Sequence, residues 1–345
     1  MIHRPLRLLL DGEALVSNWR WLRARGGDAA CGAAVKADGY SLGAREVVRQ
    51  LAAVGCRDFF VSTYAEAEAL GAWDEGLTLS VLHGPGPDDV MTAAASPARP
   101  VLNSPLQVAR WREIGEGRPC DVMVDTGMNR LGLTVEEACS GLLDGLVIET
   151  LLSHLACADE PVHPLNARQL ADFHALREVI PARRYSLANS AGICLGSDYA
   201  FDLTRPGLAL YGGVPVPADR EQRAALRQVV CLEARVVQLR DVAAGQSIGY
   251  CADYVAPQDQ TIAVVNLGYA DGWFRHLAPL GAHWNGIQLP VLGRISMDLT
   301  AIAAPLGLAE GDWVAFDLDL PRGTGPLSQY ELLTSLGSRF DRIWR

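Results

Sequence analysis

One lysine of the sequence has neighbours that suit covalent chemistry. Lys36 follows three small apolar residues in the segment AAVKADGYSLGA, residues 33–44. At the end of a buried strand an amine loses part of its water, which lowers its pKa and makes it a better nucleophile toward an aldehyde. A lysine at a strand end more often reaches solvent, so a Schiff-base function for Lys36 needs support from other residues.

Polar side chains follow several other predicted strands in the same part of the chain. Between about residues 12 and 210, short apolar runs alternate with longer segments of helical spacing. Seven or eight such βα units predict an α/β fold, a closed (β/α)8 TIM-type barrel. Reactive side chains of such barrels lie at the carboxyl ends of the strands. These ends carry Lys36, Asn103, Asp125, His154 and Asn189.

The residue pattern of the sequence changes after about residue 220. Short β-branched runs with Gly and Pro turns, such as VVCLEARVVQL and TIAVVNLGYADG, predict a second, mostly β domain. We therefore expect a barrel domain over residues 1–220 and a β-rich domain over residues 221–345. The segment PVPADRE, residues 215–221, is the predicted boundary.

The lysine segment resembles the cofactor-lysine motif of the alanine racemase family, roughly A-V-V-K-A-[ND]-A-Y-G-x-G. Lys36 falls on the cofactor lysine and Tyr40 on the tyrosine of the motif. Gly39 and Ser41 stand where the family commonly has Ala and Gly. Seven more segments match in order and spacing over nearly the whole chain: VDTGMNRLG (124–132), SHLACADEP (153–161), ANSAG (188–192), RPGLALYGG (205–213), IGYCADY (248–254), GYADGWFR (268–275) and LGRISMD (292–298).

The resemblance implies a pyridoxal-phosphate enzyme of fold type III, with no metal. Arg130 falls on the arginine that contacts the phenolic oxygen of the cofactor, and Arg205 on the arginine at the ring nitrogen. His154 is expected to hold Arg205 by a hydrogen bond. Because an arginine does not give up its proton, the ring nitrogen would stay neutral and the carbanion less delocalised. This limits side reactions such as transamination.

A phosphate site is expected where a turn precedes a helix. Tyr40, Ser190 and the backbone N–H groups of Gly207 and Leu208 are the candidate donors, and Asn189 lies beside them. Ser190 also suits a helix N-cap, and the two roles are compatible.

The implied reaction interconverts L-alanine and D-alanine and supplies D-alanine for peptidoglycan. Racemisation removes the Cα proton on one face and returns one on the other, so two bases on opposite sides of a pyridoxal-phosphate imine suffice. In the family these bases match Lys36 and Tyr250. Nearby positive charge must stabilise the tyrosine in its basic form. Arg130, Met297 and Tyr269 are the expected substrate contacts.

The same resemblance implies a homodimer in which each barrel site is completed by the partner's β domain. Tyr250 and Met297 would then come from the second subunit. Four further positions match residues that line the substrate carboxylate site and its access channel: Asp159, Arg275, Arg294 and Asp298. Met297 equally suits a place in the core.

Two further positions, outside the lysine motif, depart from the family pattern. Many members have a carbamylated lysine that bridges to the arginine matching Arg130, but this chain has Met123 there. A bound anion such as chloride, another side chain or looser placement would then position Arg130, and bicarbonate should not affect activity. The family often has a phosphate-binding tyrosine near the C-terminus, and the matching position is read as Ser338 in TSLGSRFDRI.

Composition restricts the partners and the compartment. The 345 residues carry a formal net charge of -10, which argues against nucleic acid or an anionic membrane as the main partner. Eight cysteines without a C-x-x-C pair suggest reduced, buried thiols. No apolar run reaches the length of a membrane span, so a cytoplasmic location is expected.

Three alternatives differ from an alanine racemase. A racemase for a larger or hydroxylated amino acid such as serine fits the departures at Met123 and Ser338. A non-catalytic pyridoxal-phosphate binding protein would consist of the barrel alone, without the β domain or Tyr250. The third alternative is a decarboxylase or aldolase of related fold, but the decarboxylase would be expected to have an acidic partner at the ring nitrogen in place of Arg205.

Overall fold

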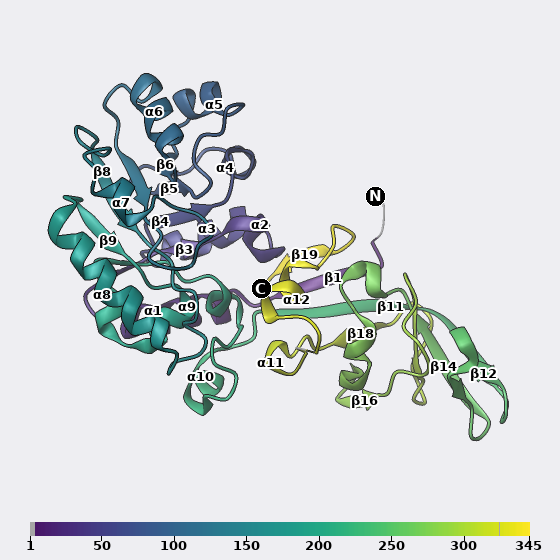
Figure 1. The fold of residues 1–345 in the computed structure, drawn as a ribbon. Helices are drawn as coiled ribbons and strands as arrows, with labels where there is room; N and C mark the ends of the chain where they lie inside the picture. The colour runs from purple at the N-terminus through teal and green to yellow at the C-terminus, as the bar shows by residue number, and fades with distance from the viewer. Residues whose placement is uncertain (1–3, 324) are drawn as a thin grey trace.

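The computed structural model describes residues 4–323 and 325–345 and consists of a barrel and a β domain (Figure 1). The barrel contains seven parallel strands, each paired with the next in chain order. They are β3 (Ala33–Ala34), β4 (Asp58–Val61), β5 (Thr78–Val81), β6 (Arg99–Leu102), β7 (Cys120–Met123), β8 (Ile148–Leu152) and β9 (Arg184–Ser186). Most positions in β4 to β8 are buried, as expected for strands covered on both faces.

A further strand connects the last of these strands with the first. β10 (Leu203–Thr204) pairs in parallel with β2 (Ala30–Cys31), which directly precedes β3. The Arg205 N–H donates to the Ala188 carbonyl at 2.9 Å, and the Asp202 N–H donates to the Tyr185 carbonyl at 3.0 Å. These bonds connect the β9 segment to β10, so the strands surround a common centre as the sequence predicted.

The barrel domain contains helices, most of which cover the outside of its sheet (Figure 1). They are α1 (Gly12–Arg25), α2 (Lys36–Tyr40), α3 (Ala44–Ala53), α4 (Tyr64–Leu70), α5 (Val90–Ala95), α6 (Pro105–Ile114), α7 (Val135–Ala138), α8 (Pro164–Val179) and α9 (Ser190–Leu195), with the 3-10 helices η1 (Ser197–Tyr199) and η2 (Leu208–Tyr211). Within the described ranges, no helix is long and apolar enough to cross a membrane.

The β domain is organised around one long strand, β11 (Val230–Val242). It pairs with β1 (Leu6–Leu10), β14 (Gln260–Val265) and β18 (Trp313–Phe316), all antiparallel. The other strands are β12 (Ser247–Ile248), β13 (Tyr254–Val255), β15 (Ala282–Trp284), β16 (Ile287–Leu289), β17 (Thr300–Ala303) and β19 (Asp341–Trp344). The helices are α10 (Arg220–Ala225), η3 (Tyr250–Ala252), η4 (Tyr269–Asp271), η5 (Arg275–Leu280), α11 (Leu320–Gly323) and α12 (Gln329–Thr334).

The first strand does not belong to the barrel, although the expected barrel domain starts at residue 1. β1 alternates buried and half-buried positions and lies between β11 and β19 in the sheet of the β domain. Leu6, Leu8 and Leu10 are buried in a core cluster that also contains Leu15 and Trp19 of α1. This shared core connects the two parts of the molecule.

Candidate functional site

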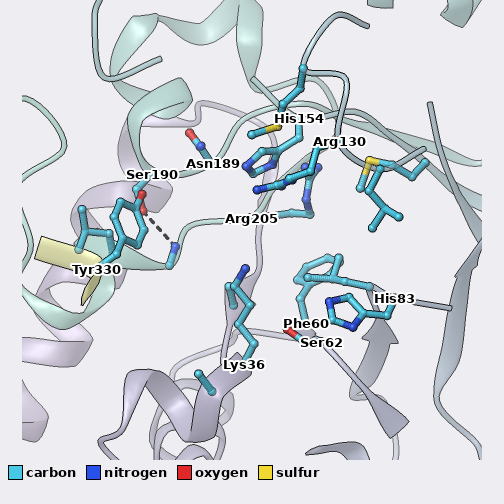
Figure 2. Close-up of a pocket in the computed structure, with 18 of the residues that line it drawn as sticks. Lys36, Phe60, Ser62, His83, Arg130, His154, Asn189, Ser190, Arg205 and Tyr330 are labelled. Carbon is cyan, nitrogen blue, oxygen red and sulfur yellow. Dashed lines mark hydrogen bonds between the residues drawn. The ribbon is translucent and has the colours of Figure 1, made fainter. Parts of the chain in front are cut away.

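A cavity of about 850 Å³ opens at the carboxyl ends of the barrel strands. All nine residues that the sequence analysis proposed for cofactor binding line it: Lys36, Tyr40, Arg130, His154, Asn189, Ser190, Arg205, Gly207 and Leu208. Figure 2 shows Lys36 extending into the cavity from one side, opposite Arg205, Arg130 and His154. The barrel topology therefore brings together residues that are far apart in the sequence.

Lys36 stands at the start of an unusual backbone turn. Residues 37–41 all have positive φ, between 52° and 68°, so α2 is a left-handed turn that follows the end of β3. The Gly39 N–H donates to the Val35 carbonyl at 2.8 Å, and the Ser41 N–H donates to the Ala37 carbonyl at 2.8 Å. Burial, followed by the positive charge of Arg130, lowers the pKa of the Lys36 amine.

Arg205 is buried at the base of the cavity. Its Nη1 donates to Ser186 Oγ, and its Nη2 donates to the Ser153 carbonyl at 2.6 Å. Burial lowers its pKa to about 10, which leaves the guanidinium charged at neutral pH. The expected hydrogen bond from His154 is not among its contacts, so this prediction was wrong. Two serine residues on β9 and after β8 fix Arg205 instead.

His154 lies beside Arg205 and Arg130 (Figure 2). Burial lowers the pKa of its imidazole to about 3, and the two arginines add to the effect. The imidazole is therefore neutral at physiological pH. A neutral ring tolerates two cationic neighbours where a protonated one would be repelled.

Asp125 fixes the loop that carries Arg130. Its Oδ1 accepts the N–H groups of Gly127 and Met128, both at 2.8 Å, and its Oδ2 accepts the Arg130 N–H at 2.9 Å. Burial opposes the shift, but these N–H donors hold the pKa of Asp125 below its usual value. Met123 lies at the end of β7, is 7% exposed and lines the cavity as an apolar side chain. Another side chain, Asp125, thus positions the Arg130 backbone.

Asn189 and Ser190 begin helix α9. Asn189 is the N-cap, and its side chain accepts the Gly192 N–H at 2.8 Å. The alternative N-cap role for Ser190 is therefore wrong, because Ser190 is the first helical residue. Ser190 Oγ accepts the Gly207 N–H at 3.0 Å, drawn in Figure 2, so this N–H already has a partner. Leu208 begins η2, and its N–H lies outside the hydrogen bonds of that helix.

Tyrosine hydroxyls enclose the same end of the cavity. Tyr40 is buried and stacks on Tyr211 with ring centroids 4.6 Å apart. A side chain at Gly207 would place its Cβ 2.2 Å from Tyr40 Oη, so only glycine fits there. Burial raises the pKa of Tyr40, which therefore stays a neutral donor.

Tyr330 is a tyrosine near the C-terminus that lies at this end of the cavity, whereas Ser338 does not, so the expected loss or shortening of a tyrosine contact at Ser338 is not what the structure shows. Tyr330 belongs to α12, lines the cavity and has its ring centroid 6.3 Å from that of Tyr40. Ser338 is exposed, lies outside the cavity lining and offers its carbonyl to Arg4. The capping box of α12, formed by Ser328 and Glu331, marks the helix that carries the tyrosine and was the available sequence signal.

Phe60, Ser62 and His83 are among the side chains of the cavity wall that the sequence analysis missed. They lie together on one side of the cavity (Figure 2). Ser62 directly follows β4, and His83 is the second residue after β5. The His83 N–H donates to the Ser62 carbonyl at 2.9 Å. The barrel rule that identified Asn103 and His154 would have identified both.

The predicted residues of the β domain lie elsewhere. Tyr250 is 66% exposed and Met297 is 54% exposed, and neither lines the cavity. The Tyr269 loop rests on the Met297 loop, because the Tyr269 N–H donates to the Ser296 carbonyl and the Ala270 N–H to the Met297 carbonyl, both at 3.0 Å. Met297 is therefore a surface residue, and the alternative that it belongs to the core is wrong.

The predicted access-channel residues of the β domain lie near the segments that carry Tyr250, Tyr269 and Met297. Arg294 pairs with Asp253, and Arg275 lies over the Tyr269 ring at 5.4 Å. Asp298 accepts from Arg339 at 2.7 Å. Asp159 is an exposed residue of the barrel.

The charge of the cavity is strongly positive. Lys36, Arg130 and Arg205 line it, whereas Asp125 is the one carboxylate among its described lining residues. Both oxygens of Asp125 are occupied by backbone donors. The cavity therefore suits an anionic ligand with a group that reacts with an amine.

Comparisons with known proteins cover nearly the whole chain. The family model of the alanine racemase N-terminal domain matches residues 10–215, and that of the C-terminal domain matches residues 229–344. The chain belongs to the alanine racemase family. It is an amino-acid racemase, built from both domains of the family.

Individual relatives are similar along nearly their full length. The chain is 41% identical over 357 residues to an alanine racemase of Methylobacterium nodulans, covering 97% of this chain and 95% of the relative. It is 41% identical over 354 residues to a catabolic alanine racemase of Mesorhizobium japonicum, covering 97% and 92%. The crystal structure of Bartonella henselae alanine racemase with covalently bound pyridoxal phosphate matches with a TM-score of 0.89 and 35% identity, covering 99% of this chain and all of that one.

Proposed function

We propose that this protein interconverts L-alanine and D-alanine, with pyridoxal phosphate held in the barrel cavity. The observation that carries the proposal is the position of Lys36 in a cavity where Arg130 and Arg205 face it and where, among the described lining residues, no free carboxylate competes. The family membership and the bound cofactor of the Bartonella henselae relative support it.

The residues of the cavity fit the proposed cofactor. Ser190, Tyr40, Tyr330 and the Leu208 N–H would hold the phosphate, because they gather hydroxyl and N–H donors at one end. Lys36 would hold the aldehyde end. When bound, pyridoxal phosphate supplies a carbon for covalent attachment and a ring that accepts electron density from the substrate's α-carbon.

Arg205 and Arg130 would orient the ring at two of its edges. Arg205 stays charged and is fixed by Ser186 and Ser153, so it donates a hydrogen bond without giving up a proton. This favours reversible proton exchange at the α-carbon over side reactions. Arg130 would face the phenolic oxygen and the substrate carboxylate from its loop on Asp125.

Proton transfer requires two bases on opposite faces of the substrate. Lys36 has a lowered pKa and extends into the cavity, which suits it to remove and return the α-proton on one face. Tyr250 would act on the other face, with Met297 and Tyr269 beside the substrate. These three residues lie outside the cavity of their own chain.

We infer that a second copy of the chain brings Tyr250 to the cavity. Tyr250 is exposed, and the next two residues, Cys251 and Ala252, have φ of 62° and 50°. Such backbone strain persists where surrounding contacts stabilise it, and it clusters at functional sites. A homodimer with shared active sites would supply those contacts and join the two bases.

The biological role is a finer part of the proposal. Supply of D-alanine for peptidoglycan is the expected role, although the Mesorhizobium japonicum relative is named catabolic. Alanine remains the proposed substrate over serine. The serine alternative rested on the departures at Met123 and Ser338. Because Tyr330 supplies a tyrosine at the phosphate end of the cavity, the departure at Ser338 no longer supports that alternative.

The direct test is racemisation by the purified protein with pyridoxal phosphate, followed by circular dichroism or a chiral separation. L-alanine should be racemised faster than L-serine, and Lys36→Ala should lose at least about a thousandfold in kcat because both the anchor and one base are removed. Failure of the wild-type protein to racemise alanine would overturn the proposal.

A further inference from the structure

In the described part of the chain, the α-helices α7 and α12 begin with a reciprocal capping box. At α7 the Thr134 hydroxyl accepts the Glu137 N–H at 3.1 Å, and the Glu137 carboxylate accepts the Thr134 N–H at 2.9 Å. At α12 Ser328 and Glu331 exchange the same two bonds, at 3.3 and 2.7 Å. In both cases the glutamate serves only the start of its own helix.

The sequence T-x-x-E recurs at the start of α4, but its glutamate is used differently. The Thr63 hydroxyl accepts the Glu66 N–H at 3.2 Å, as in a capping box. The Glu66 carboxylate accepts instead the Ser62 N–H at 2.7 Å and, with its other oxygen, the Ala37 N–H at 3.0 Å. Glu66 thus joins the end of β4 to the residue that follows Lys36.

The Ala37 N–H belongs to a turn that needs such support. Four non-glycine residues adopt the left-handed conformation in residues 37–41, which is less favourable for each of them than the right-handed form. Asp38 secures the far end of the turn by accepting the Ala44 N–H at 2.9 Å. Glu66 secures the near end, directly beside the lysine.

The negative charge of Glu66 also counteracts the effect of burial and of nearby positive charges on the Lys36 amine. Burial and the guanidinium groups of Arg130 and Arg205 lower the pKa of the amine, whereas the Glu66 carboxylate raises it. His154 faces the same amine as a neutral ring. The other titratable groups of the cavity wall are Tyr40, His83, Asp125 and Tyr330.

We propose that Glu66 is a positioning residue for Lys36, which fixes the backbone beside the lysine and tunes its amine through one carboxylate. This inference rests on the proposed function of Lys36 as the cofactor lysine. Glu66 does not line the cavity, so it acts through Lys36 and not on the substrate.

The test compares Glu66→Gln with the matched control Glu137→Gln in the full-length protein. Glutamine keeps the length of the side chain, but its NH2 group opposes one of the two N–H donors and the charge is lost. The control removes the same type of charge from a capping box that does not touch the cavity. The primary readout is the pH dependence of reductive methylation of Lys36 in cofactor-free protein, followed by mass spectrometry.

In Glu66→Gln the Lys36 methylation profile should shift to lower pH, and kcat should fall by about 10- to 100-fold because the amine is displaced. Glu137→Gln should keep the wild-type profile and a kcat within about twofold. Glu66→Asp, which keeps the charge, should shift the profile less and replaces Glu66→Gln if that variant does not fold.

A Lys36 profile that is the same in Glu66→Gln and Glu137→Gln overturns the proposal, whatever the kcat. Because the profile is read without cofactor, it is independent of whether the wild-type protein racemises alanine.

Discussion

The barrel cavity and the exposed surface of the β domain hold their proposed functional residues in opposite ways. In the cavity, Arg205 is held by two side-chain bonds and the Arg130 loop by three bonds to Asp125. On the β domain, Tyr250 and Met297 are more than half exposed. This difference indicates that one chain contains a preorganised binding site but places only one of the two proposed bases, Lys36, in that site.

The largest expected effect is on kcat, and it should distinguish the role of Tyr250 on the β domain from that of the barrel cavity. Tyr250→Phe should lower kcat by about 10²- to 10⁴-fold, since it removes one base, while the affinity for pyridoxal phosphate stays within about twofold. Steady-state kinetics and a cofactor titration measure the two quantities. A loss of cofactor affinity comparable with that of Lys36→Ala would break the comparison, because Tyr250 would then belong to the cavity of its own chain.

The second prediction concerns the neutral His154 of the cavity. Its pKa is about 3 in the folded protein and near 6.5 when unfolded, so its contribution to stability is present above pH 6.5 and is lost as pH falls toward 3. By pH 5 the loss amounts to about 2 kcal/mol. Urea unfolding of cofactor-free protein at pH 7.5 and 5.0 should show a smaller loss for His154→Gln than for wild type. Equal losses would mean that His154 is not buried as a neutral ring.

A third, smaller effect tests the phosphate end of the cavity. Tyr330→Phe removes a hydroxyl worth about 0.5–1.5 kcal/mol, so cofactor affinity should fall by about 2- to 10-fold. Ser338→Ala is the matched control and should leave the affinity unchanged, because Ser338 is exposed outside the cavity. The reverse result would restore the original assignment of Ser338.

The last prediction is that added bicarbonate has no effect on the rate of the wild-type protein. Met123 cannot be carbamylated, and Asp125 already holds the Arg130 loop, so added bicarbonate should leave the wild-type rate unchanged. Met123→Lys supplies the missing amine and is the variant in which bicarbonate can act. A clear rise in the wild-type rate would show that another group of the cavity responds to bicarbonate.

The sequence predicted most of the architecture because periodicity reports burial. Alternating βα units gave the barrel, and the strand-end rule gave Lys36, Asp125 and His154. Strand β1 was assigned to the wrong domain, since five residues carry no signal of which distant strand they pair with. Its partners, β11 and β19, follow more than 200 residues later in the chain.

The details of the site depended on contacts that no local pattern encodes. The left-handed turn after Lys36 contains four non-glycine residues, and propensity alone opposes it. The bond between Glu66 and Ala37 joins two βα units, while the motif around Glu66 suggests a local capping box. Tyr330 was missed because the motif comparison considered one matching position, Ser338, whereas the cavity lining depends on how α12 packs against the barrel.

The most direct test of the shared site mixes two inactive proteins, Lys36→Ala and Tyr250→Phe, under conditions that exchange subunits. A hybrid dimer would unite an intact barrel cavity with an intact Tyr250, so random mixing should restore about a quarter of the wild-type activity. If mixing restores no activity although mass spectrometry detects hybrid dimers, Lys36 and Tyr250 do not act across the two subunits.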